Sequence, residues 1–585
     1  MTGQILISLG KWINPFWLTG PIFEKELVVS SRRLRNYVLR FVYVGFLSFF
    51  VLSVWFAIVS FYGNTAYRTA QMSVAGRTIV TTISFYQFIM TQFVAVIMLS
   101  TAISDEIYHK TLGLLMTTPI TSFQIVMGKL LSKLLQMLLL IGVSLPLLII
   151  IRVFGGIPWS YVLSSFCITL TASLFAGSLT LYFSIKGRYA YAVILKSIFT
   201  LAFLYLFIPM IIYFMIVLIS RDPGPFITGK LTYYLSTFNP FIQMSATTAS
   251  MVAAGVGGFG GMPAASWSIH CLAMIGLTVL LVARSVSIVR RVALRQAAGE
   301  YEIPSRFRKR RKRAQMVSST AAVRNISDGV IKPVRGSPIV WKELRVPFIR
   351  GGRRSAKIAL AFSITALFVC YFSNYLTDVL DNEIAHVGYA IVFVLLGLIT
   401  NIVLSSTTIT GEKESGTWPI LLTTPLDGWQ IIIGKAIGVF RRCLPIWFFL
   451  AGHLVLFILV GYIHPVALFQ MALVVAGALV FLGCSGLYFS SIMKRTTSAV
   501  VANFGFIVFL WIFIPIFLGY TTVLTRSNPK WLYAYLSANP LTQTGVVMSA
   551  CSGSDKARAS LSNLDYQWPS NRNNDWRRSP QGNNQ

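Results

Sequence analysis

The strongest constraint on the fold is a series of apolar segments, each long enough to cross a lipid bilayer. A helix needs about 20 apolar residues to span the hydrocarbon core, because every backbone polar group must be paired within the segment. Eleven segments qualify: residues 41–62, 83–104, 131–153, 161–184, 192–220, 267–289, 358–376, 386–409, 444–463, 466–492 and 499–524. The sequence therefore predicts an all-α, polytopic integral membrane protein with about 11 transmembrane helices.

The basic residues indicate which side of the membrane each loop occupies. The formal net charge is +32, and Lys and Arg gather before the first apolar segment, between the second and third, between the fourth and fifth, and after the sixth. Short cytoplasmic loops carry such an excess, and all these loops lie on one side by alternation. We expect a multi-pass protein of the cell membrane (inner or cytoplasmic membrane) with a cytoplasmic N-terminus. The same distribution argues against nucleic-acid binding.

A run of basic residues follows the sixth apolar segment. Residues 306–313 read RFRKRRKR, a composition also found in nuclear-localisation and nucleic-acid-binding segments. The position directly after a membrane helix favours contact with the anionic headgroups of membrane lipid instead. We expect residues 298–332 to form a basic cytoplasmic linker.

The chain contains an internal repeat, which fixes its architecture. Residues 21–27 (PIFEKEL) recur as residues 338–344 (PIVWKEL), and residues 106–129 (EIYHKTLGLLMTTPITSFQIVMGK) recur as residues 412–435 (EKESGTWPILLTTPLDGWQIIIGK). The dipeptide Ile208-Pro209 recurs as Ile514-Pro515, and Asn239-Pro240 recurs as Asn539-Pro540. Six spans return the chain to its starting side, so the second half enters the membrane in the same orientation. This predicts two parallel repeats, with six and five spans, about a pseudo-twofold axis along the membrane normal.

The second half has no counterpart of the sixth span. Residues 551–585 are polar and contain no apolar run long enough to cross. We expect a first half-unit at residues 1–297, the linker at 298–332, a second half-unit at 333–550 and a polar, disordered tail at 551–585. Eleven spans would leave this tail outside the cytoplasm, although a frameshift near the end of the gene would give the same pattern.

The repeated segment between the second and third spans carries the most specific pattern in the chain. In both halves it holds acids where the second span leaves the membrane, then a short apolar stretch, then Thr-Thr-Pro. Proline cannot continue a helix but fits the start of a new one, so Thr-Thr-Pro separates two helices. Residues 121–124 (TSFQ) and 427–430 (DGWQ) match the capping-box pattern that opens the next helix. The pattern predicts a short amphipathic cytoplasmic helix between two spanning helices.

In this segment the chain resembles the type-2 permeases of ABC transporters, which carry Glu, Gly-Thr, Leu-Leu, Thr-Pro and Gly-Lys in this order. The second repeat is the closer match, because Gly416-Thr417 supplies the Gly-Thr where the first repeat has Lys110-Thr111. The resemblance covers both halves and implies two exporter-type half-units fused in one chain. It also implies that each short helix is a coupling helix that binds an ATPase. The amphipathic helix before the first span of each half would lie along the membrane near that ATPase.

The resemblance assigns candidate residues to these two roles. The candidate coupling residues are Glu106, Thr111, Leu115, Thr118, Pro119 and Gln124 in the first half, and Glu412, Glu414, Gly416, Thr417, Leu421, Thr424, Pro425 and Gln430 in the second. The candidate interfacial-helix residues are Lys25, Glu26, Lys342 and Glu343. Leu115 and Leu421 occupy matching places on the short apolar face, so we expect them to bury against the partner.

Nucleotide binding is expected on another chain. A phosphate-binding loop needs Gly-x-x-x-x-Gly-Lys followed by Ser or Thr, whereas the Gly-Lys pairs here precede Trp12, Leu130, Leu231 and Ala436. We expect no catalytic residue, no metal site and no cofactor on this chain, with ATP and magnesium bound by an ABC ATPase partner in two copies. The implied function is that of the membrane-spanning permease subunit of an ATP-driven exporter, whose substrate the sequence does not identify.

Two other functions stay open on the sequence. An ion-coupled carrier or channel usually holds ionisable residues within its spans, and these spans hold almost none. His453 is the clearest central candidate, although a lone intramembrane histidine is more often hydrogen-bonded to a neighbouring helix. A non-transporting scaffold that recruits an ATPase is the second alternative. Transport under a proton gradient without ATP would indicate the carrier, and tight ATPase binding without transport-linked stimulation would indicate the scaffold.

Overall fold

The computed structural model describes residues 15–552, except for residues 33, 59–64, 109, 110, 156, 188, 221–224, 257–264, 298–335, 346–351, 377–379, 381 and 526–529. The expected linker and nearly all of the expected tail lie outside the described residues. Within them the chain is helical, and its one extended pairing is an isolated bridge between Ile463 and Ser552. Nine of the described helices are long and apolar enough to cross a membrane. The predicted all-α, polytopic membrane fold is therefore confirmed.

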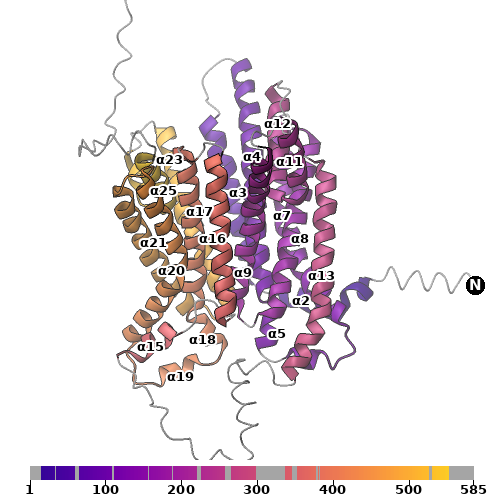
Figure 1. The fold of residues 1–585 in the computed structure, drawn as a ribbon. Coiled ribbons are helices and arrows are strands. Elements are labelled where there is room, and N and C mark those ends of the chain that lie inside the picture. The colour runs from indigo at the N-terminus through magenta and orange to yellow at the C-terminus, as the bar shows by residue number, and fades with distance from the viewer. Residues whose placement is uncertain are drawn as a thin grey trace, which may run out of the picture.

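The first half is a bundle of long helices with short helices at both ends (Figure 1). Its elements are α2 (Pro15–Ser31), α3 (Leu34–Ile58), α4 (Thr65–Ser100), α5 (Ser104–Tyr108), α6 (Leu112–Leu115), α7 (Ser122–Gly155), α8 (Trp159–Lys186), α9 (Ala190–Ala202), the π-helix η1 (Phe203–Phe207), α10 (Ile208–Ser220), α11 (Pro225–Phe238), α12 (Pro240–Val256) and α13 (Trp267–Ala297).

The second half forms a neighbouring bundle with nearly the same order of elements. Its elements are α15 (Pro338–Arg345), α16 (Gly352–Leu376), α17 (Glu383–Thr407), α18 (Thr410–Glu414), α19 (Trp418–Leu422), α20 (Gly428–Val460), α21 (Val466–Ile492), α22 (Thr496–Val508), the π-helix η2 (Phe509–Phe513), α23 (Ile514–Thr525), α24 (Lys530–Leu536) and α25 (Pro540–Cys551).

Nine of the predicted spans coincide with the nine long apolar helices. The other two predicted spans coincide with α3 and α16, which contain the shorter apolar stretches Arg40–Phe49 and Leu360–Leu376. The count of 11 spans therefore stays a prediction.

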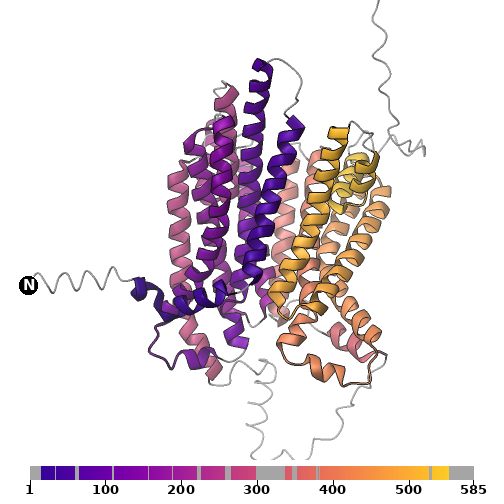
Figure 2. The same cartoon turned by 180° about the vertical axis from the view of Figure 1, so that it is seen from behind.

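The two halves contact each other reciprocally. The helix α10 of the first half packs against α16 of the second half, and α23 packs against α3 (Figure 2). Aromatic rings line both contacts: the Phe203 and Phe362 centroids are 4.6 Å apart, and those of Phe49 and Phe513 are 3.8 Å apart. This exchange of equivalent contacts is the arrangement expected around a pseudo-twofold axis.

In each half, the asparagine of Asn-Pro pairs a carbonyl that the proline of Ile-Pro leaves without its helical donor. Proline has no N–H, so Pro209 and Pro515 each leave the carbonyl four residues earlier without its helical donor. In a membrane such a group must be paired by other means. The Asn239 amide nitrogen donates to the Tyr205 carbonyl at 2.8 Å, and the Asn539 amide nitrogen donates to the Trp511 carbonyl at 3.0 Å. Both carbonyls lie in the π-helices η1 and η2, so the same contact stabilises the same irregular backbone in each half.

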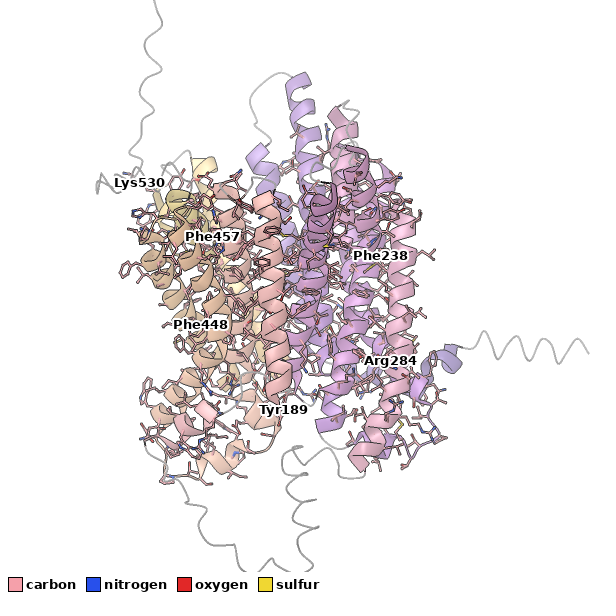
Figure 3. All side chains as sticks on the ribbon, viewed as in Figure 1. Tyr189, Phe238, Arg284, Phe448, Phe457 and Lys530 are labelled. Atoms are coloured by element: carbon pink, nitrogen blue, oxygen red, sulfur yellow. The ribbon has the colours of Figure 1, made fainter. Side chains whose placement is uncertain are left out.

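Each half also has a helix pair that the apolar pattern of the sequence does not predict. The pairs α11–α12 and α24–α25 lie at one end of the bundle, opposite the end that holds α5, α15, α18 and α19. Lys530 lies toward the first end, and Tyr189 and Arg284 lie toward the other (Figure 3). Asn239 and Asn539 cap the second helix of each pair by accepting from the N–H of Phe241 and Leu541. The Asn-Pro pairs were the available signal, since Asn at the N-cap and Pro at the first turn open a helix.

Candidate functional site

The predicted short cytoplasmic helices are α6 and α19, each preceded by a five-residue helix, α5 or α18. A serine of the fourth span positions each pair. The Ser184 hydroxyl accepts from the N–H of Ile103 and of Ser104 at 3.1 and 2.9 Å, and the Ser490 hydroxyl accepts from two N–H groups at the matching place before α18, both at 2.9 Å. Because α5 and α18 begin here, these first N–H groups have no acceptor within their own helix and need another one. The fourth span therefore fixes where the coupling segment leaves the bundle.

The repeated Thr-Thr-Pro closes the short helices. In α6 the hydroxyls of Thr117 and Thr118 donate to the carbonyls of Leu114 and Leu115, at 2.7 and 2.6 Å. The Thr423 and Thr424 hydroxyls do the same in α19, at 2.8 and 2.6 Å. The last carbonyls of a helix lack backbone donors, and the following proline has no N–H to supply one. The threonine hydroxyls therefore pair the last carbonyls of each short helix before the next helix starts.

An acid and a threonine close the turn that enters each short helix. The Thr111 hydroxyl donates to the Glu106 carboxylate, and the Thr417 hydroxyl donates to the Glu412 carboxylate. Gly416 lies between the second pair with a φ of +66°, in the left-handed region that favours glycine. This turn explains the family's Gly-Thr in the second half. Lys110, which replaces that glycine in the first half, lies outside the described residues.

A buried lysine of the third span connects the coupling segment to the interfacial helix. In the second half the Lys435 Nζ lies 2.9 Å from Glu412 Oε1 and 2.9 Å from Glu343 Oε1 of α15. In the first half the Lys129 Nζ lies 3.1 Å from Glu106 Oε1 and 3.7 Å from Glu26 Oε1 of α2. Each lysine therefore holds together three elements that are distant in the sequence.

Further cations complete these clusters. Lys133 lies 3.3 Å from Glu26 in the first half, whereas Arg442 pairs with Glu343 and Lys342 lies 3.2 Å from Glu412 in the second. Lys133 and Arg442 do not occupy matching positions of the repeat. The glutamate of the interfacial helix therefore has two cationic partners in each half. The first partner is the matching lysine of the third span, and the second lies at a different turn of that span in the two halves.

These cations keep the second-half acids ionised. Burial opposes ionisation of Glu412, but hydrogen bonds from Thr417 and Lys435 and the charges of Lys435 and Lys342 lower its pKa to about 2. Burial likewise opposes ionisation of Glu343, and the nearby Lys435 and Arg442 lower the pKa of that carboxyl. A lowered carboxyl pKa stabilises the folded state above the ordinary pKa and loses this effect as the pH falls through the lowered value. The Glu412 contacts are therefore intact at neutral pH.

The interfacial helix α15 lies directly on two glycines of α20. A Cβ at Gly434 would meet the Ile339 Cγ2 at 2.6 Å, and a Cβ at Gly438 would meet the Glu343 Cβ at 2.9 Å. Two glycines one helical turn apart have no side chains, so a second helix can pack closely against that surface. This close contact brings Glu343 to Lys435 and fixes α15 across the end of the bundle.

The coupling segments expose apolar side chains at matching positions. Ile420 is 66% exposed and Trp429 is 70% exposed, and their counterparts Leu114 and Phe123 are also exposed. Leu422 is exposed as well. Large exposed apolar side chains gathered at one end of a bundle mark an interaction surface. We call these five residues the apolar coupling face.

The structure places the sequence-predicted residues as follows. Leu115 and Leu421 are half-buried, and the more exposed positions are their neighbours Leu114, Ile420 and Leu422. Gln124 forms the expected capping box with Thr121, through bonds of 3.1 and 3.2 Å. The capping box expected at Asp427 and Gln430 is wrong, because Asp427 caps no N–H and both side chains are exposed to solvent. Pro119, Pro425 and Lys25 are exposed, and Glu26 is half-buried.

Glu414 belongs to the coupling segment, but its carboxylate contacts the fifth span. Its carboxylate accepts from the Thr496 N–H at 2.7 Å and from the Thr496 hydroxyl at 2.6 Å, at the start of α22. A carboxylate at a helix N-terminus pairs its free N–H groups and complements the helix dipole. The structure thus ties Glu414 to the fifth span.

Lys129, Lys435, Arg442 and the two serines Ser184 and Ser490 were absent from the candidate residues. The retained Gly-Lys pair at the end of the repeated segment was the available signal for the two lysines. His453, the clearest candidate for a proton path, has its Nδ1 2.7 Å from the Tyr371 hydroxyl of α16. It is hydrogen-bonded to a neighbouring helix, as expected, but it is not a lone intramembrane histidine, because the His386 ring of α17 lies 5.6 Å away between centroids.

Comparison with known proteins adds one match. Residues 301–567 match the family model described as ABC-2 family transporter protein. No curated protein and no solved structure matches the chain. The match includes α15 to α25 and thus the second coupling segment and its interfacial helix. Residues 301–567 are therefore similar to ABC-2 family transporter proteins, and this likeness supports a membrane permease of an ABC transporter.

Proposed function

We propose that this permease exports its substrate with energy from ATP hydrolysis on a separate ABC ATPase subunit. The observation that carries the proposal is the apolar coupling face, which recurs at matching positions in both halves and at one end of the bundle. In the second half this face belongs to the region matched by the ABC-2 family model. The end that bears α6 and α19 is then cytoplasmic, in agreement with the basic loops.

Two coupling faces in one chain fit an ATPase in two copies. Each ATPase would bind one face, and closing of the ATPase pair on ATP would displace both coupling segments. Because Lys129 and Lys435 join each segment to the third span and to the interfacial helix, this displacement would move the span as one body. The bundle would then switch between inward-open and outward-open forms. The family resemblance favours a hydrophobic or amphipathic substrate.

Site-specific cross-linking tests the location of the ATPase. A photo-reactive amino acid placed at Leu114 or at Ile420 is expected to form an adduct with the co-purifying ABC ATPase, because both side chains belong to the apolar coupling face. Phe448 of α20 is equally exposed but lies within a membrane span, so the same group there is the matched control. Adducts with lipid only, or equal ATPase adducts from Phe448, would contradict the proposal.

A further inference from the structure

The short helix α18 binds the second coupling segment to the end of the fourth span. The Lys413 Nζ donates to the carbonyls of Ser490 and Met493, both at 3.2 Å, where α21 ends. The last carbonyls of a helix lack backbone donors, and a cation near them complements the helix dipole. Lys413 therefore fixes α18 at this end of α21.

The next residue, Glu414, binds α18 to the start of α22. Its carboxylate accepts from the N–H and the hydroxyl of Thr496, at 2.7 and 2.6 Å. Thr496 is buried and is the first residue of α22, and the preceding Arg495 supplies no side-chain cap. Glu414 takes the place of that cap. Two adjacent residues of opposite charge thus bind α18 to the end of one span and the start of the next.

The first half has different residues at these places. Ile107 and Tyr108 match the two charged residues of α18, and Ala190 matches Thr496. Ala190 has no side-chain hydroxyl, and Ile107 is buried in an apolar cluster that includes Val292 of α13. The helix α6 of this half also packs against α13. The first coupling segment is therefore held against α13 by apolar contacts, whereas the second is bound to α22 by a carboxylate.

The residue that Glu414 binds shares one face of α22 with the residues that meet the first half. Val500 and Phe504 follow Thr496 at intervals of four residues, and so lie on the same side of the helix. Val500 is buried in an apolar cluster with residues of α4 and α9. The ring centroids of Phe504 and of Phe93 in α4 are 5.1 Å apart. The face of α22 that starts at the Glu414 contact therefore packs against the first half.

We propose that Glu414 transmits the movement of the second coupling segment to α22 and so moves α22 away from α4. The inference rests on the proposed function, because closing of the ATPase pair supplies the movement. A helix behaves as a rigid element, so a displacement of its first N–H group displaces the residues of the next turns as well. Glu414 is then a positioning residue for the spans and does not contact the ATPase, which is the role that the family resemblance implies for it. The two coupling segments act on different helices, the first on α13 and the second on α22.

A disulfide between positions 93 and 504 measures this movement in the full chain with its ATPase in liposomes. The reporter chain carries Phe93→Cys and Phe504→Cys, with Ser in place of the exposed Cys484. The two rings are already in contact, so a displacement of α22 lengthens the distance between these positions. We expect ATP and magnesium to lower the disulfide yield about tenfold, because a disulfide forms only between closely placed residues.

Substitution of Glu414 in the reporter chain then tests its role. Glu414→Ala removes both bonds to Thr496 and should abolish the effect of ATP on the disulfide yield, with ATPase co-purification unchanged. Glu414→Gln retains an oxygen that can accept from the Thr496 N–H, so it should restore most of the effect. Thr496→Val loses one of the two bonds and should give an intermediate effect. Thr497→Val, in the same turn of α22, is the matched control and should behave like the unsubstituted reporter.

Two results would overturn the inference. Loss of ATPase co-purification in Glu414→Ala would show that Glu414 contacts the ATPase itself. An equal effect of ATP with Glu414 and with Glu414→Ala would show that the carboxylate only caps α22. A wild-type chain that binds no ATPase would instead contradict the proposed function, and the inference with it, so the two failures are distinguished by the wild-type chain.

Discussion

Replacing Ile420 and Trp429 together with Ala is expected to abolish co-purification of the ABC ATPase. Both side chains are mostly exposed at the end of the bundle, so burial of each against an ATPase groove would stabilise the complex by about 2 kcal/mol. Loss of both would weaken binding by about 4 kcal/mol, or roughly 1,000-fold. Pull-down of the ATPase by the tagged chain measures this effect.

The first half supplies a graded comparison for the same experiment. Leu114→Ala with Phe123→Ala removes the matching pair, but Phe123 is only 39% exposed, so we expect a smaller loss of binding. The control variant Phe448→Ala removes an exposed side chain of similar size within the membrane and should leave binding intact. Wild-type ATPase binding by the Ile420→Ala/Trp429→Ala variant would mean that the apolar coupling face rests on lipid.

Replacing Lys435 with Met is expected to release the interfacial helix α15 from the bundle. The substitution removes the cation that Glu343 and Glu412 share, and breaking a buried ion pair from one side costs about 3–5 kcal/mol. Hydrogen exchange of residues 338–345 should then accelerate roughly 100-fold or more, if this cost appears as local opening of α15. Exchange measured by mass spectrometry gives the rate for this segment separately from the rest of the chain.

The matched variant Lys129→Met tests whether burial sets the size of the effect. Glu26 and Glu106 have side-chain exposures of 26% and 25%, against 4% for Glu343, so solvent compensates more of the lost pairing. We expect a smaller acceleration of exchange in α2. Combining Lys435→Met with Arg442→Met should accelerate the exchange of α15 further, because Arg442 is the second cation that pairs with Glu343. Unchanged exchange of α15 in Lys435→Met would show that the Gly434 and Gly438 contact alone holds the helix.

The spans and the short helices could be predicted because their signals are local. Long apolar runs and Thr-Thr-Pro act within a few residues, and the structure shows nine of the spans and both short helices where these patterns placed them. The helix pairs α11–α12 and α24–α25 could not be predicted in the same way. They are short and of mixed polarity, so they resemble loops in a scan for spans.

The ion pairs could not be predicted from the sequence for a different reason. Glu343 and Lys435 are 92 residues apart in the sequence, and their contact depends on the close approach of α15 to two glycines of α20. No local sequence pattern predicts such a close contact between two helices. The exposed face was also misplaced by one residue, from Leu421 to its neighbours, because a five-residue helix contains too few turns to establish a hydrophobic period.

ATP hydrolysis measured in liposomes tests the central claim most directly. The chain alone, the co-purifying ATPase alone and the two together are compared, with the Ile420→Ala/Trp429→Ala variant as the uncoupled form. The account predicts no hydrolysis by the chain alone, a rate for the wild-type pair that differs from that of the ATPase alone, and no such difference with the variant. Hydrolysis by the chain alone, or an ATPase rate that is the same with and without the wild-type chain, would contradict it.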